Sequence, residues 1–280
     1  MKKRLGTVAV HAALIFAVVA TLYPVLWVVK LALAHGQGLA LSANPWPTEL
    51  HFGNFVDVVS ARASDGRLLF VRQLANSLVV SLAVTVVGIV FSVSAAYALS
   101  RMHFRGRELT LRGFLVSQML PGVVSSIPLY VLLDKLHLLD RLTGLILVYT
   151  SGAVPFCVFM LKGFFDSLPK ELEEAVLLDG GTKLQAFFYV ALPLARPAIA
   201  VTALFSFLSA WNEFILAATL MNDPTSFTLP VQLQRYVGDF STEWGRFAAG
   251  AILVSLPVMA LFLSLEKHLT GGLTQGGVKG

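Results

Sequence analysis

The sequence of 280 residues combines a hydrophobic share of 56% with a charged share of 13%, which is about half of the charged share of a typical soluble domain. The mean hydropathy of +0.75 is typical of a protein embedded in a bilayer and excludes a soluble enzyme. The net charge is +5, but the basic residues lie between apolar runs, where they orient membrane helices. We therefore expect no nucleic-acid partner.

Six apolar runs are long enough to cross a bilayer, which takes roughly 20 residues per helix. All six are predicted to be helical, because lipid offers the backbone no hydrogen-bond partners and the runs lack the alternation of a barrel strand. The sequence predicts an all-α integral membrane protein with a single transmembrane domain over residues 1–280. The spans are predicted at about residues 8–34, 74–99, 114–133, 142–161, 198–220 and 247–265.

The first span could also be a cleavable signal peptide, because it follows Lys2-Lys3-Arg4 and ends near a small-residue stretch at Ala32. Its apolar run is nearly twice as long as the apolar core of a signal peptide, which favours a retained helix. With the N-terminus inside, most of the 21 lysines and arginines fall in inner segments. This bias predicts that both termini are cytoplasmic.

Prolines interrupt two of the middle spans. Pro121 and Pro128 lie in the third span and Pro155 lies in the fourth. Proline removes one backbone hydrogen bond from a helix, so we expect these two helices to bend.

The segment between the fourth and fifth spans, residues 166–193, predicts two short helices. Gly180 and the glycine after it can take the positive φ that ends a helix. Thr182 and Gln185 have the spacing of a capping box for the second helix, which is expected to end before Pro193.

This segment resembles the EAA loop of ABC importer permeases, whose pattern is E-A-A-x3-G-x9-I-x-L-P. The matching residues run from Glu174-Ala175-Val176 through Gly180 and Val190 to Leu192-Pro193, with valine replacing the third-place alanine and the isoleucine. The resemblance implies a cytoplasmic coupling helix that docks in a cleft of an ATPase subunit. The coupling residues that it implies are Glu173, Glu174, Ala175, Val176, Asp179, Gly180, Leu192 and Pro193.

The alternative for residues 166–193 is an amphipathic loop on the lipid surface. Glu171, Glu173 and Glu174 lie close together in it, and an anionic inner leaflet would repel them. The acidic cluster therefore favours docking on a protein.

No nucleotide site is visible in the chain, because no G-x-x-x-x-G-K-[ST] sequence occurs. The six histidines form no i, i+4 pair and no H-E-x-x-H, so no metal site is expected. The sequence also contains no G-x-S-x-G motif, so no catalytic residue is expected. We predict a transport subunit whose ATP and Mg²⁺ are bound by a separate ATPase.

Nearly the whole chain resembles the carbohydrate permeases of ABC importers, and the maltose/maltodextrin type in particular. The resemblance rests on the six-span layout, on Tyr97-Ala-Leu-Ser-Arg-Met-His-Phe104, on Trp211-Asn-Glu-Phe214 and on the tail from Gly271. It implies the fold of a type I ABC importer permease that moves maltose or maltodextrin across the bacterial inner membrane by alternating access. Trehalose or another oligosaccharide stays open.

The resemblance also implies the partners. They are a second permease chain (MalF-like), two copies of an ATPase subunit (MalK-like) and a periplasmic or extracellular sugar-binding protein (MalE-like), with the lipid bilayer around the permeases. A gradient-driven secondary transporter is the alternative from another class. Such folds usually show internal repeats and buried charges at mid-membrane. In this sequence no repeat is evident, and Glu213 is the one candidate for a buried charge.

The glycine-rich tail, residues 268–280, can thread a narrow crevice without side-chain clashes. The resemblance implies that it reaches between the two ATPase subunits, while composition alone would also suit a disordered end. The residues implied in this contact are Thr274, Gln275, Gly276 and Gly277.

The fifth span carries a polar stripe, because Thr202, Ser206, Ser209 and Glu213 share one face of a predicted helix. A carboxylate is expensive in a span, so Glu213 should face protein, water or the headgroup region. Trp211 lies on the opposite face as a candidate interfacial anchor. The translocation-path candidates are Thr202, Ser206, Ser209, Asn212 and Glu213.

Overall fold

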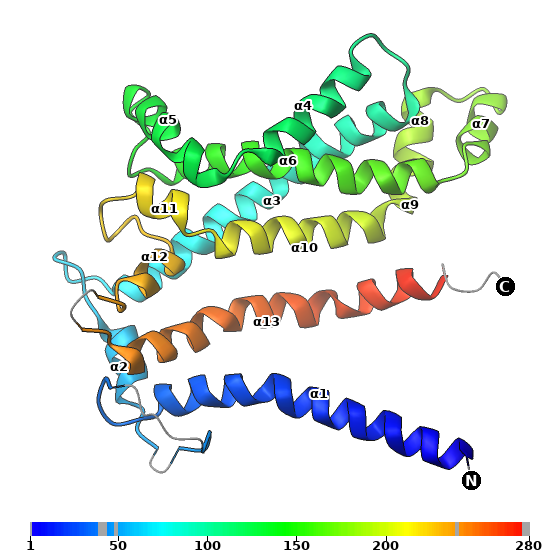
Figure 1. The fold of residues 1–280 in the computed structure, drawn as a ribbon. Coiled ribbons are helices and arrows are strands. Elements are labelled where there is room, and N and C mark those ends of the chain that lie inside the picture. Colours follow the sequence, from blue (N-terminus) through cyan, green and yellow to red (C-terminus); the bar gives the residue numbers. More distant parts are fainter. Residues whose placement is uncertain (1, 39–43, 48–49, 239–240, 276–280) are drawn as a thin grey trace. The chain divides into compact units, whose positions relative to one another are not determined.

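The computed structural model describes residues 2–38, 44–47, 50–238 and 241–275, with side chains described between residues 7 and 265 (Figure 1). The described residues are helical or irregular and contain no strand, only isolated bridges between Arg62 and Leu68 and between Val237 and Thr242. The predicted all-α fold is confirmed.

The chain forms two compact units. Unit 1 comprises Met1–Arg72 and Val231–Leu256, and unit 2 comprises Gln73–Pro230 and Pro257–Gly280. The prediction of one transmembrane domain stays a prediction.

Unit 1 is built from α1 (Lys2–Ala32), α2 (Gly53–Ser60) and the first part of α13 (Trp244–Gln275), and α12 (Leu229–Gln234) lies at its boundary. Its core joins the end of α1 to α2 and to the start of α13 (Figure 1). The Asn54 amide donates to the carbonyls of Ala32 and Ala34, 3.1 Å away in each case. These bonds satisfy the carbonyl of Ala32, the last residue of α1, and that of Ala34 just after the helix. The buried core residues are Leu31, Ala32, Val58, Ala248 and Ala249.

Unit 2 holds the long helices around which the site is built. Helix α10 lies along α6, α4 packs on α6, and α11 packs on α5. Helices α7 and α8 lie together at one end of this unit, and α5 and α11 lie at the other (Figure 1). Its helices are α3 (Leu69–Arg101), α4 (Arg107–Met119), α5 (Gly122–Lys135), α6 (Leu142–Ser167), α7 (Glu171–Leu178), α8 (Lys183–Ala186), the π-helix η1 (Phe187–Ala191), α9 (Leu192–Leu194), α10 (Arg196–Asn212) and α11 (Ile215–Leu220).

One core of unit 2 joins the end of α3 to α6 and to the helix after α8. The Tyr97 ring packs edge-on against Phe165 and lies 4.6 Å from the ring of Phe187. Alanines at positions 96, 191 and 195 are buried with them, and such small side chains let membrane helices approach closely. The end of α3 is therefore fixed where α6 ends and α8 begins.

Four described helices are long and apolar enough to cross a membrane, namely residues 7–32, 69–101, 142–167 and 244–265. Two bent helix pairs also meet this criterion: α4 with α5, and the helix from Lys183 to Leu194 with α10. If each pair forms one span, the described residues contain up to six spans. This number agrees with the six apolar runs predicted from the sequence, but two of the six spans are bent helix pairs.

The predicted span over residues 114–133 is broken rather than gently bent. Helix α4 ends at Met119, α5 begins at Gly122, and the two axes meet at 99°. Pro121 is the residue before α5 and has extended backbone angles. The bend expected at Pro121 is confirmed, and it is sharper than one lost hydrogen bond requires.

The predicted span over residues 198–220 is interrupted as well. Helix α10 ends at Asn212, Glu213 has an extended backbone with ψ 127°, and α11 begins at Ile215. The continuous helix expected here is wrong, and the side-chain contacts of Glu213, described below, explain how the break is stabilised.

Candidate functional site

The loop formed by residues 166–193 has the two-helix arrangement expected of it. Helix α7 ends at Leu178, and Gly180 follows with φ 84°, a conformation that favours glycine. Thr182 and Gln185 form the predicted capping box, in which the Thr182 hydroxyl accepts from the Gln185 N–H and the Gln185 side chain accepts from the Thr182 N–H. Both local predictions are confirmed.

The sequence predicts that the second helix ends before Pro193, and this prediction is wrong. The helix runs on from α8 through the π-helical η1 into α9, which contains Pro193, and bends by 69° at Ala195. A π-helical turn shifts the hydrogen-bond register, so the missing N–H of Pro193 is accommodated inside a continuous helix. Leu192 and Pro193 are half-buried there.

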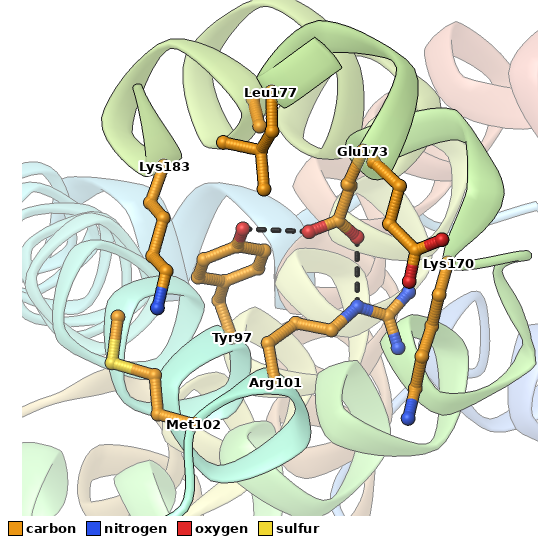
Figure 2. Close-up of a pocket in the computed structure, with 9 residues that line it drawn as sticks. Tyr97, Arg101, Met102, Lys170, Glu173, Leu177 and Lys183 are labelled. Carbon is orange, nitrogen blue, oxygen red and sulfur yellow. Dashed lines mark hydrogen bonds and ion pairs between the residues drawn. The ribbon is translucent and has the colours of Figure 1, made fainter. Parts of the chain in front are cut away.

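Glu173 faces the interior of the unit rather than a partner. Its carboxylate accepts hydrogen bonds from the Tyr97 hydroxyl and from Nε of Arg101, both at 2.7 Å. Figure 2 shows the three side chains pointing toward one another below α7. We call this contact the Glu173 joint. A pocket of about 150 Å³ beside it is lined by these residues and by Met102, Lys170, Glu174, Leu177, Lys183 and Ala186.

Most of the rest of α7 is exposed, including Glu174 at the pocket beside the joint. Glu174, Ala175 and Asp179 are exposed, Val176 is half-buried, and Leu178 is 88% exposed. Leu184 on α8 and Tyr189 on η1 are exposed as well. Helix α7 packs against α8 and η1, its side-chain hydrogen bonds among the described residues are accepted by the Glu173 carboxylate, and it presents acidic and apolar side chains that the described residues leave exposed.

The tail candidates are only partly described. The backbone of Thr274 and Gln275 belongs to the last turn of α13. Gly276 and Gly277 lie outside the described residues.

The polar stripe of the fifth span contributes to a groove along α6 and α10. Thr202 and Ser206 are buried, whereas Ser209 and Asn212 are exposed. Two pockets share Gly152, Ala153 and Ser209 and form what we call the α6–α10 groove. Its remaining lining residues are Val84, Gln118, Val148, Tyr149, Phe156, Phe205, Ser206, Leu208, Ala210, Asn212, Glu213 and Leu216.

Glu213 lines this groove and does not continue the helix. Its carboxylate accepts from the backbone N–H groups of Leu216 at 2.9 Å and Ala217 at 3.2 Å, and also from the Tyr149 hydroxyl. The side chain therefore caps α11, where backbone donors have no helical partner. This explains how a carboxylate and a helix break coexist in one span.

Trp211 is not an interfacial anchor. Its side chain is 2% exposed and stacks on Phe207, with ring centroids 5.5 Å apart. The indole fills the interior of the unit.

The cap predicts a stability difference. Glu213→Ala leaves two backbone N–H groups and the Tyr149 hydroxyl without their acceptor, so we expect a loss of roughly 3 kcal/mol or more, against about 1.5–3 kcal/mol for Tyr149→Phe. Thermal unfolding of the purified chain in detergent, followed by circular dichroism, measures both. Asn212→Ala is the control, because Asn212 is exposed and makes no side-chain hydrogen bond with the described residues. Equal midpoints for Glu213→Ala and Asn212→Ala would contradict the capping role.

Sequence reasoning missed the partners of two predicted residues. The resemblance of the Tyr97–Phe104 segment gives no role to Tyr97 or Arg101, yet both bind Glu173, and Tyr149 binds Glu213. The available signal was the pairing of a basic residue at the end of a span with an acidic cluster at the same membrane surface.

Comparison with known proteins supports a transport role for this arrangement. Residues 88–271 match the family of binding-protein-dependent transport system inner membrane components. The chain belongs to this family. It is thus a multi-pass inner-membrane permease, a transport subunit rather than an enzyme. The assignment decides against a gradient-driven carrier.

Relatives with similarity along nearly the whole length differ in the solute that they are named for. The galactooligosaccharide permease GanQ of Bacillus subtilis is 36% identical over 96% of this chain and 94% of its own length. The diacetylchitobiose permease DasC of Streptomyces coelicolor is 34% identical over 100% of both. The maltose/maltodextrin permease MalG of Escherichia coli K12 is 36% identical over 96% of this chain and 95% of its own length.

A solved structure supports the fold. A chain of a bacterial ABC transporter that imports the acidic polysaccharide alginate superposes with a TM-score of 0.77 at 23% identity, over 95% of this chain and 97% of that chain. The permease family and the all-helical membrane fold, both expected from the sequence, are confirmed.

Proposed function

We propose that this chain is one of two permease subunits of an ATP-driven sugar importer and that residues 166–193 dock on the ATPase subunit. The observation that carries the proposal is the contrast between Glu173 and its neighbours on α7. Glu173 is buried in the joint, whereas Glu174, Ala175 and Leu178 are exposed. Burying such an apolar surface with acidic neighbours against a basic groove provides both affinity and orientation.

The proposed solute is a neutral oligosaccharide, with maltose and maltodextrin as first candidates. GanQ, DasC and MalG are named for three different carbohydrates, so the support extends to the class of solute. Trehalose and other oligosaccharides remain alternatives.

The α6–α10 groove is the proposed path along this chain. Phe156 and Phe205 give it an apolar wall, with ring centroids 6.4 Å apart. Ser209 and Asn212 add exposed hydroxyl and amide groups, which are the groups that orient a sugar. Thr202 is buried and donates to the Ala198 carbonyl at 2.7 Å, so its proposed part is to shape the helix beside the path.

The proposed assembly places both termini and the loop of residues 166–193 in the cytoplasm. A MalF-like second permease, two MalK-like ATPases and a MalE-like binding protein would complete it. The tail residues Thr274, Gln275, Gly276 and Gly277 are proposed to contact the ATPases.

Uptake of labelled oligosaccharides tests the solute. The chain would be expressed with its own partner subunits in a bacterial host that lacks other oligosaccharide importers, and maltose, maltotriose, trehalose and a β-linked galactobiose would be compared. We expect maltose and maltotriose to be taken up at least about tenfold faster than in cells with the empty vector. Uptake of only trehalose or galactobiose would replace maltose as the solute, and uptake of none would contradict the sugar class.

A further inference from the structure

We propose that the Glu173 joint makes the end of α3 move together with α7, so that Arg101 acts as a positioning residue for ATP-driven transport. This inference rests on the proposed docking of the ATPase on α7. It adds a defined mechanical connection from the docking surface to the wall of the groove.

The contact between α3 and α7 fixes an orientation as well as a distance. Both carboxylate oxygens of Glu173 are used, one by Nε of Arg101 and the other by the Tyr97 hydroxyl. A third bond runs from Nη2 of Arg101 to the Leu168 carbonyl at 2.9 Å, just before α7 begins. The planar guanidinium therefore bridges α3 to a side chain of α7 and to the backbone of the connection between α6 and α7, which a lysine could not do with this geometry.

Burial makes this ion pair hard to separate. The side chains of Arg101 and Glu173 are 9% and 11% exposed. An exposed ion pair of this kind contributes little, but pulling one partner out of a buried pair leaves an uncompensated charge. The joint should therefore stay closed while α7 moves.

The rest of α7 offers no competing polar attachment. Among the described residues, no other side chain of α7 donates or accepts a hydrogen bond. Beside the joint, Asp166 near the end of α6 accepts from the Ser100 hydroxyl and from the Lys162 ammonium, both at 2.6 Å. The ends of α3 and α6 and the start of α7 therefore form one body.

Helix α3 connects this body to the groove. It is continuous from Leu69 to Arg101, and Val84 on the same helix lines the groove beside Tyr149 and Glu213. At 1.5 Å per residue, Arg101 and Val84 lie about 25 Å apart along the axis. A displacement of α7 is thereby carried to the groove wall by a single rigid helix.

The test compares transport with hydrolysis in the complete complex, reconstituted in liposomes with the binding protein and the oligosaccharide that passes the uptake test. Glu173→Gln and Arg101→Gln should retain the ATPase subunits, because the exposed face of α7 is intact. We expect the number of sugar molecules imported per ATP to fall at least about tenfold in each. The double variant should lose no more than either single variant, because the two residues act as a unit.

Glu108→Gln is the matched control, since Glu108 is also an exposed glutamate but lies in α4, outside residues 166–193, and it should keep the original ratio of sugar to ATP. An unchanged ratio of imported sugar to hydrolysed ATP in assembled Glu173→Gln and Arg101→Gln complexes would contradict the proposed role of the joint. If these two variants fail to assemble, Tyr97→Phe decides: a loss of roughly twofold or more supports the joint, because one hydrogen bond to the carboxylate is gone, and an unchanged ratio overturns it.

The same assay separates this inference from the proposed function. If Glu174→Lys leaves ATPase binding and hydrolysis unchanged, the ATPase docks elsewhere and the proposed function fails. If Glu174→Lys releases the ATPase while the Glu173 and Arg101 variants transport normally, the proposed docking on α7 stands and only the proposed role of the Glu173 joint is contradicted.

Discussion

Glu174→Lys is expected to lower solute-stimulated ATP hydrolysis of the reconstituted complex at least about tenfold, which corresponds to roughly 1.4 kcal/mol or more of lost coupling free energy. Glu174 lies in the first turn of α7 with its side chain exposed. The reversed charge would face the basic groove that we propose on the ATPase, and like charges brought together at an interface repel strongly. Glu174 lines the pocket beside the Glu173 joint but makes no side-chain hydrogen bond with the described residues, so the permease should still insert in the membrane.

Hydrolysis would be measured with and without binding protein and sugar. Glu108→Lys provides the matched control, because Glu108 is also an exposed glutamate but lies in α4, outside residues 166–193. The docking account expects the control to behave as the unmodified complex. Full stimulation of ATP hydrolysis by binding protein and sugar in Glu174→Lys would contradict the docking account.

Ser209→Trp is expected to reduce sugar uptake at least about tenfold while basal ATP hydrolysis continues. Ser209 is exposed and belongs to both pockets of the α6–α10 groove. An indole at this position would occupy space that the sugar needs, and a filled site cannot accept a ligand of similar volume.

Ser209→Ala is the control for this substitution, because it removes the hydroxyl without adding bulk. Uptake should then stay within about threefold of the original rate, since a single neutral hydrogen bond contributes about 0.5–1.5 kcal/mol. Normal uptake by Ser209→Trp in fully assembled complexes would show that sugar does not pass along this groove.

Local sequence signals predicted the loop well. Gly180 has the positive φ expected of it, and Thr182 with Gln185 forms the expected capping box. Such features depend on residues within one turn of each other, so the sequence alone contains the needed information.

Long-range pairing could not be predicted in the same way. Glu173 and Arg101 are 72 positions apart, and nothing in either segment alone distinguishes Glu173, which is buried, from Glu174, which is exposed. The choice depends on how α6 presents α7 to the end of α3.

The prediction of a continuous helix in the fifth span was wrong for a different reason. A helical wheel assumes continuous helix, and on that assumption Glu213 extends the stripe of Ser206 and Ser209. The carboxylate instead caps α11 and replaces the backbone bonds that the break removes. The helical wheel assumes that the helix continues through Glu213, so it could not predict the position of a side chain at which the helix ends.

The most direct test of the central claim is chemical crosslinking between α7 and the ATPase subunit in membranes. The chain has one cysteine, Cys157, which is buried in α6, so Cys157→Ser gives a permease chain without a thiol of its own. A thiol-to-amine crosslinker would be applied to Leu178→Cys, at an exposed position on α7, and to Val56→Cys, at an exposed position on α2. The account predicts a crosslink to the ATPase from Leu178→Cys and none from Val56→Cys. Absence of the Leu178→Cys product in an actively transporting complex would contradict docking on α7.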